Sequence, residues 1–382
     1  MPTQPSSPTG WVAIASGALD VRASTPFSSD IEILVAPAIP GEAMWVAGAG
    51  ARLWRRLVHG GPLNTRDDEE RSMLHDMETL GIASPDAAHP DRVTRLPEPV
   101  LSSPVHELVY AVTARVAAAH GIPCLFIKGP ALHHQGLRER EHSGDVDVWC
   151  HPRHWDALAE ALSAWGWHRE PDPWRGTSVH HTATMTPPSW GCEIDVHRRI
   201  PGLALDDEDA FAIASRWRTV VTYAGVDVAI PRRDTHAVLA AVHAVRPEIG
   251  AGARSAAASH SASAMLAAAE GSAERACELG AVPVLRAELA GLLPDEILDA
   301  HAGGRPRDWQ WRGARNRAVA YWRALGEEPW LVRLRVLWRF VWPPDDIALA
   351  SARQAADAST NPNIVRWRRL LRGARGLLPH RR

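Results

Sequence analysis

Two aspartates stand two residues apart in the segment SGDVDVW, at positions 145 and 147. The segment alternates polar and apolar residues, which predicts a β-strand with both aspartates on one face and Val146 and Val148 on the other. Two carboxylates on one face repel each other, and each raises the pKa of the other unless a cation lies between them. A hard divalent cation, Mg²⁺ or Mn²⁺, is the partner that carboxylate oxygens favour. The pair Asp145 and Asp147 therefore predicts a metal site.

A third carboxylate comes from the segment CEIDVHR, which also reads as a strand. Asp195 shares one face of this strand with Glu193 and His197, while the residues between them are apolar. If the two strands are neighbours, Asp195 completes the site, and Glu193 and His197 lie beside the ligands as a second layer. Three carboxylates can hold two divalent ions for in-line attack at phosphorus, because one ion activates the attacking hydroxyl and the other neutralises a triphosphate.

Lys128 is the single lysine among the 382 residues, and arginine supplies the other long cationic side chains. An ammonium is a compact point charge that fits a narrow site around one phosphate oxygen, whereas a guanidinium is a planar fork. Gly129 follows the lysine, and Ser143-Gly144 precede the first aspartate, where a hydroxyl and bare backbone let a phosphate come close. We expect these four residues to contact a phosphate group. Chance survival of one lysine is the alternative.

The segment from 101 to 232 alternates predicted helices and strands, and it has to position these side chains. Apolar runs predict strands at 123–129, 145–150, 177–186 and 191–198. Capping and spacing signals predict helices at 103–121, 130–137, 151–167 and 207–217. A hairpin is predicted to turn at Ala224-Gly225. We therefore expect an α+β domain with a mixed sheet and flanking helices.

The segments on either side of this domain have different compositions. Residues 1–29 are rich in Pro, Ser and Thr and predict a partly disordered start, with WVAIASGALDV at 11–21 as a candidate first strand. Residues 30–85 predict a small winged-helix-like module, and 86–100 predict a linker. A helical C-terminal domain is predicted at 233–350, with a mobile loop at 250–264 because that stretch is low in complexity. Residues 351–382 predict a basic tail of solvated arginines, for which RNA, an anionic membrane surface or an acidic partner are alternative contacts.

The composition argues against several classes of protein. A formal net charge of -2 gives no global field for nucleic acid or membranes. The four cysteines are far apart and form no CxxC pair, so we expect neither a zinc site nor a disulfide framework. Paired histidines at 133–134 and 180–181 are common by chance among 19 histidines, and we interpret them as surface or core residues. Without a signal peptide or a long apolar run, we expect a cytoplasmic protein with no transmembrane segment.

The segments FIKGPAL, SGDVDVWCHP and CEIDVHRRI, in this order, resemble the motifs of an uncharacterised nucleotidyltransferase family of the DNA polymerase beta superfamily. The later RVLWRFVWPPDDIAL is similar to the closing segment of that family, so the resemblance spans about residues 100 to 350. It implies a minimal nucleotidyltransferase sheet, two magnesium ions and an NTP, such as ATP, as donor. In many relatives an arginine stands four residues before the first aspartate, where this chain has Glu141.

The same resemblance implies roles for the candidate residues. Asp145 and Asp147 would be catalytic metal ligands, and Asp195 would be the third ligand or the base. Ser143 and Gly144 would contact the nucleotide phosphates, with Lys128 and Gly129 as further nucleotide contacts.

A second resemblance concerns residues 30 to 85. The segments AMWVAGAGARLWRRLVHGG and EERSMLHDMETLGI are similar to small winged-helix peptide-binding domains of the PqqD type. This resemblance implies a peptide as partner. A structural cap or a dimerisation module is the alternative.

Together these features predict a magnesium-dependent nucleotidyltransferase that moves an NMP from an NTP to an unknown acceptor. A peptide or protein is one option for the acceptor, and RNA or a small metabolite are others. Two alternatives stay open. One is a non-catalytic nucleotide- or peptide-binding protein on the same fold, and the other is a metal-dependent phosphohydrolase that uses His197 with the aspartates.

Overall fold

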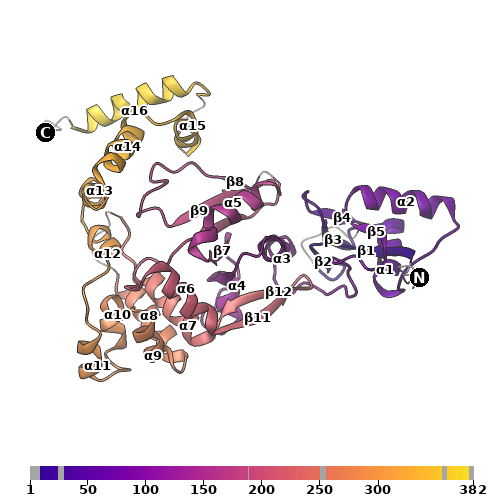
Figure 1. Ribbon diagram of the computed structural model, residues 1–382, viewed down its shortest axis with the longest axis horizontal. Coiled ribbons are helices and arrows are strands. Elements are labelled where there is room, and N and C mark those ends of the chain that lie inside the picture. Colours follow the sequence, from indigo (N-terminus) through magenta and orange to yellow (C-terminus); the bar gives the residue numbers. More distant parts are fainter. Residues whose placement is uncertain (1–8, 25–29, 188, 250–254, 355–358, 378–382) are drawn as a thin grey trace, which may run out of the picture.

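A five-stranded sheet lies at the centre of the computed structural model, which describes residues 9–24, 30–187, 189–249, 255–354 and 359–377 (Figure 1). Its strands, in spatial order, are β6 (Cys124–Ile127), β7 (Asp145–Cys150), β10 (Glu193–His197), β9 (Thr182–Thr186) and β8 (His168–Arg169). β7 and β10 run parallel, and the other neighbours are antiparallel. The predicted α+β class with a mixed sheet is therefore confirmed.

Helices cover both faces of this sheet. The four that do so are α3 (Pro104–Ala119), α5 (Trp155–Ser163), α6 (Asp207–Arg216) and α7 (Arg233–Ala244). Val146 and Val148 of β7 belong to the apolar core formed with α3 and α5, whereas Trp149 packs in a second core with α6 and α7. Because side chains alternate along a strand, Asp147 leaves the sheet on the same face as Trp149. Strand alternation thus directs the aspartate away from the larger apolar core.

A hairpin lies next to the first strand of the sheet. It consists of β11 (Arg218–Tyr223) and β12 (Val226–Pro231), and β12 contacts β6. The turn is at Ala224 and Gly225, which both have positive φ angles of 49° and 79°. The hairpin predicted from the sequence is therefore present at the predicted turn.

The N-terminal module contains short strands and two helices. These are β1 (Thr9–Ala13), β2 (Gly17–Asp20), β3 (Ile33–Ala36), β4 (Met44–Val46), α1 (Gly48–His59), α2 (Asp68–Thr79) and β5 (Ala83–Asp86). The candidate strand at 11–21 is present as two strands, β1 and β2, and Val12 and Leu19 are fully buried in apolar clusters. Residues 1–8 and 25–29 lie outside the described residues. The likeness to a peptide-binding module stays a prediction.

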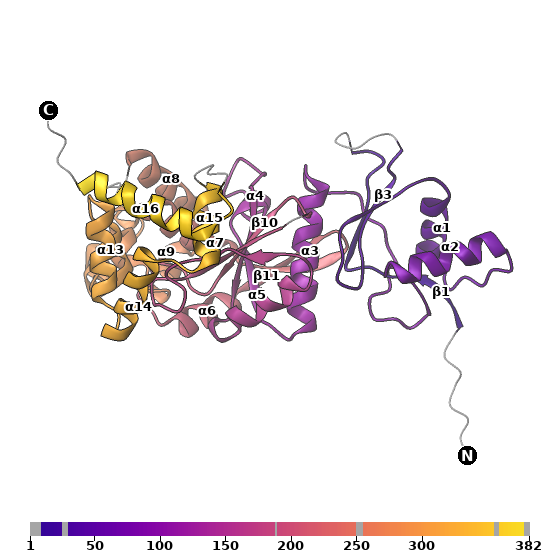
Figure 2. The same cartoon turned by 90° about the horizontal axis from the view of Figure 1, so that it is seen from above.

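The C-terminal part is helical, as the sequence predicts. Its helices after α7 are α8 (Ala256–Ala268), α9 (Ser272–Glu278), α10 (Val282–Leu289), α11 (Asp295–Ala300), α12 (Arg307–Arg312), α13 (Arg317–Gly326), α14 (Trp330–Val341), α15 (Asp345–Gln354) and α16 (Pro362–Leu377). The last of these helices and the N-terminal module lie at opposite ends of the molecule (Figure 1 and Figure 2). Among the described helices, none has the length and apolar character that spanning a bilayer requires.

Helix α8 occupies most of the predicted mobile loop at 250–264. Ser255 caps the helix, since its side-chain oxygen accepts a hydrogen bond from the backbone N–H of Ala258 at 3.1 Å. Ala262 and Leu266 are buried against neighbouring helices. Alanine has the highest helix propensity, so an alanine-rich repeat favours a helix once one face reaches a core. The loop prediction is wrong from residue 256 onward, and 250–254 lie outside the described residues.

Candidate active site

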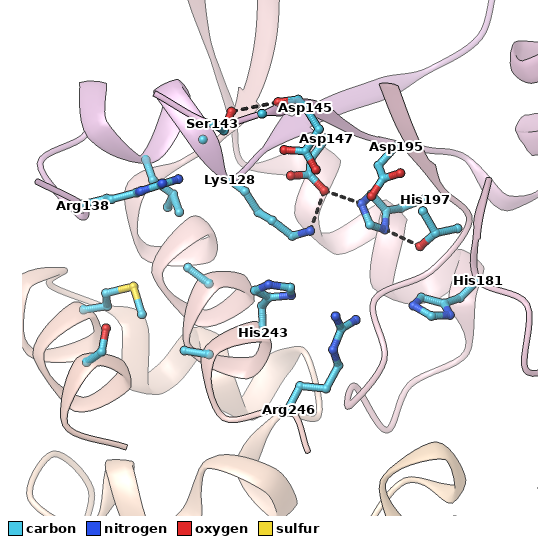
Figure 3. A pocket seen from close by; sticks show the side chains of 18 of the residues that line it. Lys128, Arg138, Ser143, Asp145, Asp147, His181, Asp195, His197, His243 and Arg246 are labelled. Carbon is cyan, nitrogen blue, oxygen red and sulfur yellow. Dashed lines mark hydrogen bonds and ion pairs between the residues drawn. The ribbon is translucent and has the colours of Figure 1, made fainter. Parts of the chain in front are cut away.

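Two carboxylates and an imidazole converge where β7 and β10 run side by side. The parallel register sets Asp195 opposite Asp147, so both side chains leave the same face of the sheet. One ligand atom each of Asp147, Asp195 and His197 lies within 4.8 Å of the others. Figure 3 shows these three side chains directed toward one point. The two strands expected to be neighbours are indeed adjacent, and their polar faces coincide.

Asp147 is the centre of a hydrogen-bond network. Its side chain is almost completely buried, and its Oδ1 accepts from Lys128 Nζ at 2.5 Å and pairs with His197 Nε2 at 2.6 Å. Burial raises the pKa of Asp147, but the hydrogen bond from His197 and the charge of Lys128 outweigh it and hold the pKa below its ordinary value. Asp147 is therefore a carboxylate at neutral pH, and the single lysine of the chain lies directly against it.

His197 and Asp195 are each oriented by a threonine of β9. Thr182 Oγ1 lies 2.9 Å from His197 Nδ1, and Thr184 Oγ1 donates to Asp195 Oδ1 at 2.7 Å. Burial, followed by the charge of Lys128, lowers the pKa of His197, which favours the neutral ring. A threonine hydroxyl can donate or accept, so either tautomer of His197 is satisfied at Nδ1. These threonines alternate along a predicted strand, but no pattern in the sequence distinguishes them from other threonines.

Lys128 has an unusual backbone conformation. Its φ and ψ are 60° and -159°, a region that residues other than glycine rarely adopt. Its backbone N–H donates to His236 Nε2 at 2.9 Å, and His236 Nδ1 lies 2.8 Å from Gln135 Oε1. His236 is fully buried, and this burial lowers its pKa to about 3, so the neutral ring can accept from Lys128. A chain of hydrogen bonds through His236 thus holds a strained residue in place.

Gly129, the residue after Lys128, lies in close contact with Ser143. A Cβ at Gly129 would lie 2.7 Å from Ser143 Oγ, and the φ of Gly129 is +45°, so only glycine fits. Ser143 Oγ donates to the backbone carbonyl of Asp145 at 2.8 Å, which fixes the start of β7. Ser143 and Gly144 both line the cleft described next, but the hydroxyl is already engaged with the backbone.

A cleft of about 1470 Å³ opens over this group of residues. One wall of the cleft contains Lys128, Asp145, Asp147, Asp195 and His197. The facing wall is formed by the end of α7, by α8 and by α12 and α13. His243 and Arg246 extend into the cleft from the direction of α7 (Figure 3). The cleft is large enough for a nucleotide together with part of a second molecule.

Two of the residues singled out from the sequence are not at the centre of this site. Glu193 is exposed and does not line the cleft. Asp145 lines the cleft but is absent from the tight group of three ligands. Burial, with repulsion from Asp147 and Asp195, raises the pKa of Asp145 to about 6. Asp145 is therefore a half-buried carboxylate at the rim of the group.

Glu141 occupies the position where many relatives have an arginine. Its Oε1 accepts hydrogen bonds from the backbone N–H and the hydroxyl of Ser102, at 2.8 and 2.6 Å. Glu141 does not line the cleft, whereas Arg138 and Arg140 on the same loop do. The glutamate therefore ties this loop to the segment before α3 and leaves the charge of the cleft unchanged.

A divalent cation fits the donor set. Carboxylate oxygens and an imidazole nitrogen are ligands for Mg²⁺, Mn²⁺ and similar ions, and the three candidate atoms lie at ligand spacing. Burial raises the pKa of Asp145, and repulsion from Asp147 and Asp195, which a bound cation would relieve, raises it as well. Asp147 and Asp195, with His197 and Asp145 next to them, are the residues that would hold it.

The comparisons with known proteins agree with this geometry. Residues 110–255 match the model of a family described as uncharacterised nucleotidyltransferase. A search of curated proteins finds no match. The matched range is shorter than the span of the predicted resemblance, because it ends before α8. It includes the whole five-stranded sheet and each candidate ligand. Residues 110–255 of this chain are therefore similar to the uncharacterised nucleotidyltransferase family.

Proposed function

We propose that the protein transfers a nucleoside monophosphate from an NTP to an acceptor and releases pyrophosphate, with Mg²⁺ or Mn²⁺ at the carboxylates. One observation carries the proposal. Asp147, Asp195 and His197 meet at ligand spacing at the base of a large cleft, within a segment that is similar to a nucleotidyltransferase family. Divalent ions held there would neutralise charge on the phosphates and lower the pKa of an attacking hydroxyl.

The residues of the chain have distinct tasks in this proposal. Asp147 and Asp195 would hold the ions, with Asp145 next to them at the rim. Lys128 stabilises Asp147 while the ions are absent, since its Nζ lies 2.5 Å from Asp147 Oδ1. When the phosphates enter, the same ammonium is within reach of a phosphate oxygen, because it lines the cleft.

The transfer step makes one bond and breaks one bond. The acceptor hydroxyl oxygen bonds to the α-phosphorus as the bond from that phosphorus to the bridging oxygen breaks, and pyrophosphate leaves with the electron pair. The hydroxyl proton passes to Asp195 Oδ2. Thr184 donates to the other oxygen of the same carboxylate and so holds it in position.

The acceptor is proposed to be a hydroxyl-bearing molecule that enters through the open side of the cleft. A peptide or protein is our first choice, because the N-terminal module has a likeness to peptide-binding domains. RNA and small metabolites are the other options. The identity of the base in the NTP is left to experiment.

The test is a transfer assay with NTPs labelled at the α-phosphate, incubated with a cell lysate as the source of acceptor. Wild-type protein is expected to move label onto a macromolecule or metabolite and to release pyrophosphate. Asp147→Asn and Asp195→Asn should each lower the transfer rate roughly a hundredfold or more. Asp209→Asn is the matched control, because Asp209 is an exposed aspartate of α6 outside the cleft.

Two results would contradict the proposal, and each favours a different alternative. Release of inorganic phosphate without label transfer would favour a phosphohydrolase. Metal-dependent NTP binding with neither product, measured by calorimetry and lost in Asp147→Asn, would favour a non-catalytic nucleotide-binding protein.

A further inference from the structure

The wall of the cleft that faces the carboxylates carries two arginines without partners. Arg246, just after α7, and Arg312, the last residue of α12, both line the cleft. Within the described parts of the chain, neither guanidinium has a hydrogen bond or an ion pair. Figure 3 shows Arg246 extending toward the side of the cleft that holds Asp147 and His197.

Arg312 is the more deeply buried of the two. Its side chain is only 7% exposed, and its Nε is buried without a hydrogen-bond partner. The guanidinium carbon lies 4.9 Å from the centre of the Trp311 ring, so the cation rests on an aromatic face. Burial removes the water molecules that hydrate a guanidinium group, and without an anion the lost free energy of hydration is not compensated. A negatively charged partner would therefore stabilise Arg312 at this position.

Acidic side chains also stand near the two arginines. Asp308 is buried on α12, and its Oδ2 accepts from Arg199 Nη1 at 3.0 Å. The charge of Asp308 favours the charged form of both arginines, and Glu248 acts on Arg246 in the same way. His181 also lies in this part of the cleft, and burial, with the charges of Arg312 and Arg199, lowers its pKa so that it stays neutral. Among the described residues neither carboxylate forms an ion pair with Arg246 or Arg312, so both guanidinium groups can still bind an anion.

The pKa shifts of the two arginines also favour a bound anion. Burial and the charge of Arg246 lower the pKa of Arg312 to about 10, while Asp308 acts in the opposite direction. Burial also lowers the pKa of Arg246, while Asp147, Asp308, Asp195 and Glu248 act in the opposite direction. Two like charges that disfavour each other in a buried place gain most from an anion between them.

We propose that Arg246 and Arg312 form a phosphate-binding subsite on the wall of the cleft opposite the metal ligands. The guanidinium fork suits a tetrahedral oxyanion, because it can donate two parallel hydrogen bonds to phosphate oxygens. The choice of phosphate rests on the proposed function, in which every donor carries a triphosphate. The phosphate has two possible sources, the β- and γ-phosphates of the donor and a phosphate group on the acceptor.

The test is calorimetric titration of the full chain with sodium tripolyphosphate in buffer that contains EDTA. Wild-type protein is expected to bind, and Arg246→Gln and Arg312→Gln should each weaken binding roughly ten- to a hundredfold, as expected for loss of a charge-assisted hydrogen bond. Arg233→Gln and Arg315→Gln are the matched controls, since both arginines are exposed and lie on or near the same helices. The controls should bind as the wild type does.

A second titration distinguishes the two sources of phosphate. The probe is an α,β-methylene nucleoside triphosphate, again without a divalent cation. If the subsite takes the donor, both glutamine variants bind this probe more weakly than the controls do. If it takes the acceptor, the probe binds all variants equally and only tripolyphosphate binding is weakened. Either pattern supports the subsite.

The inference is overturned if tripolyphosphate does not bind, or if both glutamine variants bind it as tightly as the two controls. Arg312→Lys guards against a folding defect, because it keeps the charge and should keep part of the affinity, and melting temperatures of all variants are compared. Since no divalent cation is present in these titrations, a negative result would not contradict the proposed nucleotidyl transfer. Failure of the labelling assay, in turn, leaves the subsite standing if tripolyphosphate binding depends on these arginines.

Discussion

Lys128 combines a functional side chain with a backbone conformation that suits glycine. Its ammonium is the closest cation to Asp147, whereas its φ of 60° and ψ of -159° place it among strained residues. Such strain costs about 1–3 kcal/mol and persists only where the surroundings enforce it. Here His236 accepts the backbone hydrogen bond that maintains it. The structure therefore predicts that stability and function oppose each other at this residue.

Two substitutions separate these contributions at position 128. Lys128→Ala and Lys128→Gly both remove the ammonium and leave Asp147 with one partner fewer. Only glycine also relieves the backbone strain, so Lys128→Gly should be more stable than Lys128→Ala by about 1–3 kcal/mol. Urea unfolding of the two variants measures the difference. Equal midpoints, or a more stable alanine variant, would show that the backbone at 128 is not strained.

The carboxylates could be predicted from the sequence because strand alternation determines which face a residue occupies. Asp145, Asp147 and Asp195 were selected on that pattern, and the structure has Asp147 and Asp195 in register on neighbouring strands. His236 could not be selected in the same way. It is one of 19 histidines and lies 108 residues beyond the lysine whose backbone it binds. Contacts of this kind follow from tertiary packing and leave no local pattern.

Among the elements, α8 shows how a composition can be misread. Serine and alanine repeats are typical of mobile segments, yet alanine also favours a helix when one side is buried. The buried residues Ala262 and Leu266 are four positions apart, which is the spacing of a helix face. The spacing of this pair can be read from the sequence. The surfaces of α7 and α10 against which α8 packs cannot, because they depend on the tertiary fold.

The cap of α8 provides a test of this helix. Ser255→Ala should lower the free energy of unfolding by about 0.5–2 kcal/mol, because the N–H of Ala258 loses its acceptor. Ser255→Asp keeps an acceptor at the cap and should retain most of the stability. Hydrogen–deuterium exchange is the complementary measurement, since amides at 260–264 should be protected. Full exchange there within seconds would favour the mobile loop.

The strands and helices that hold the site were largely predictable, because each has its own periodicity and its own boundary signals. The hairpin at Ala224-Gly225 and the strands β7 and β10 follow this rule. At 11–21 the sequence indicated one candidate strand, whereas the structure has two short strands there, β1 and β2. Their stability comes from pairing with β5 and β3 and from burial.

For the molecule as a whole, buried histidines predict how stability depends on pH. Burial lowers the pKa of His236 and of His243 to about 3 and that of His180 to about 4, and it also lowers the pKa of His106, His181 and His197. These rings therefore favour the neutral form in the folded state, while in the unfolded chain they bind protons below pH 6.5. The unfolded state gains protons first as the pH falls, so stability decreases on acidification. Asp145 acts in the opposite direction, because its pKa is raised to about 6 in the folded state. Near and below this pH the folded state binds a proton at Asp145 more readily than the unfolded chain does, which stabilises the folded state.

The expected loss between pH 7.5 and pH 6.0 is at least about 2 kcal/mol, as measured by urea unfolding at the two pH values. His236→Gln should lose less over the same range, because one of the buried histidines no longer titrates. His59→Gln is the matched control, since His59 is exposed at the end of α1. A midpoint that does not change, or that rises on acidification, would contradict the assignment of neutral buried rings.

The cleft joins parts of the chain with different relationships to the family. Its acidic wall lies within residues 110–255, whereas Arg312 and the rest of the α12–α13 surface lie beyond the matched segment. Natural selection can therefore act on the two walls separately. Proteins that share the matched segment can keep the acidic wall and still differ in the helical wall, so an exchange of the helical part would change what the cleft accepts while the proposed metal ligands stay the same.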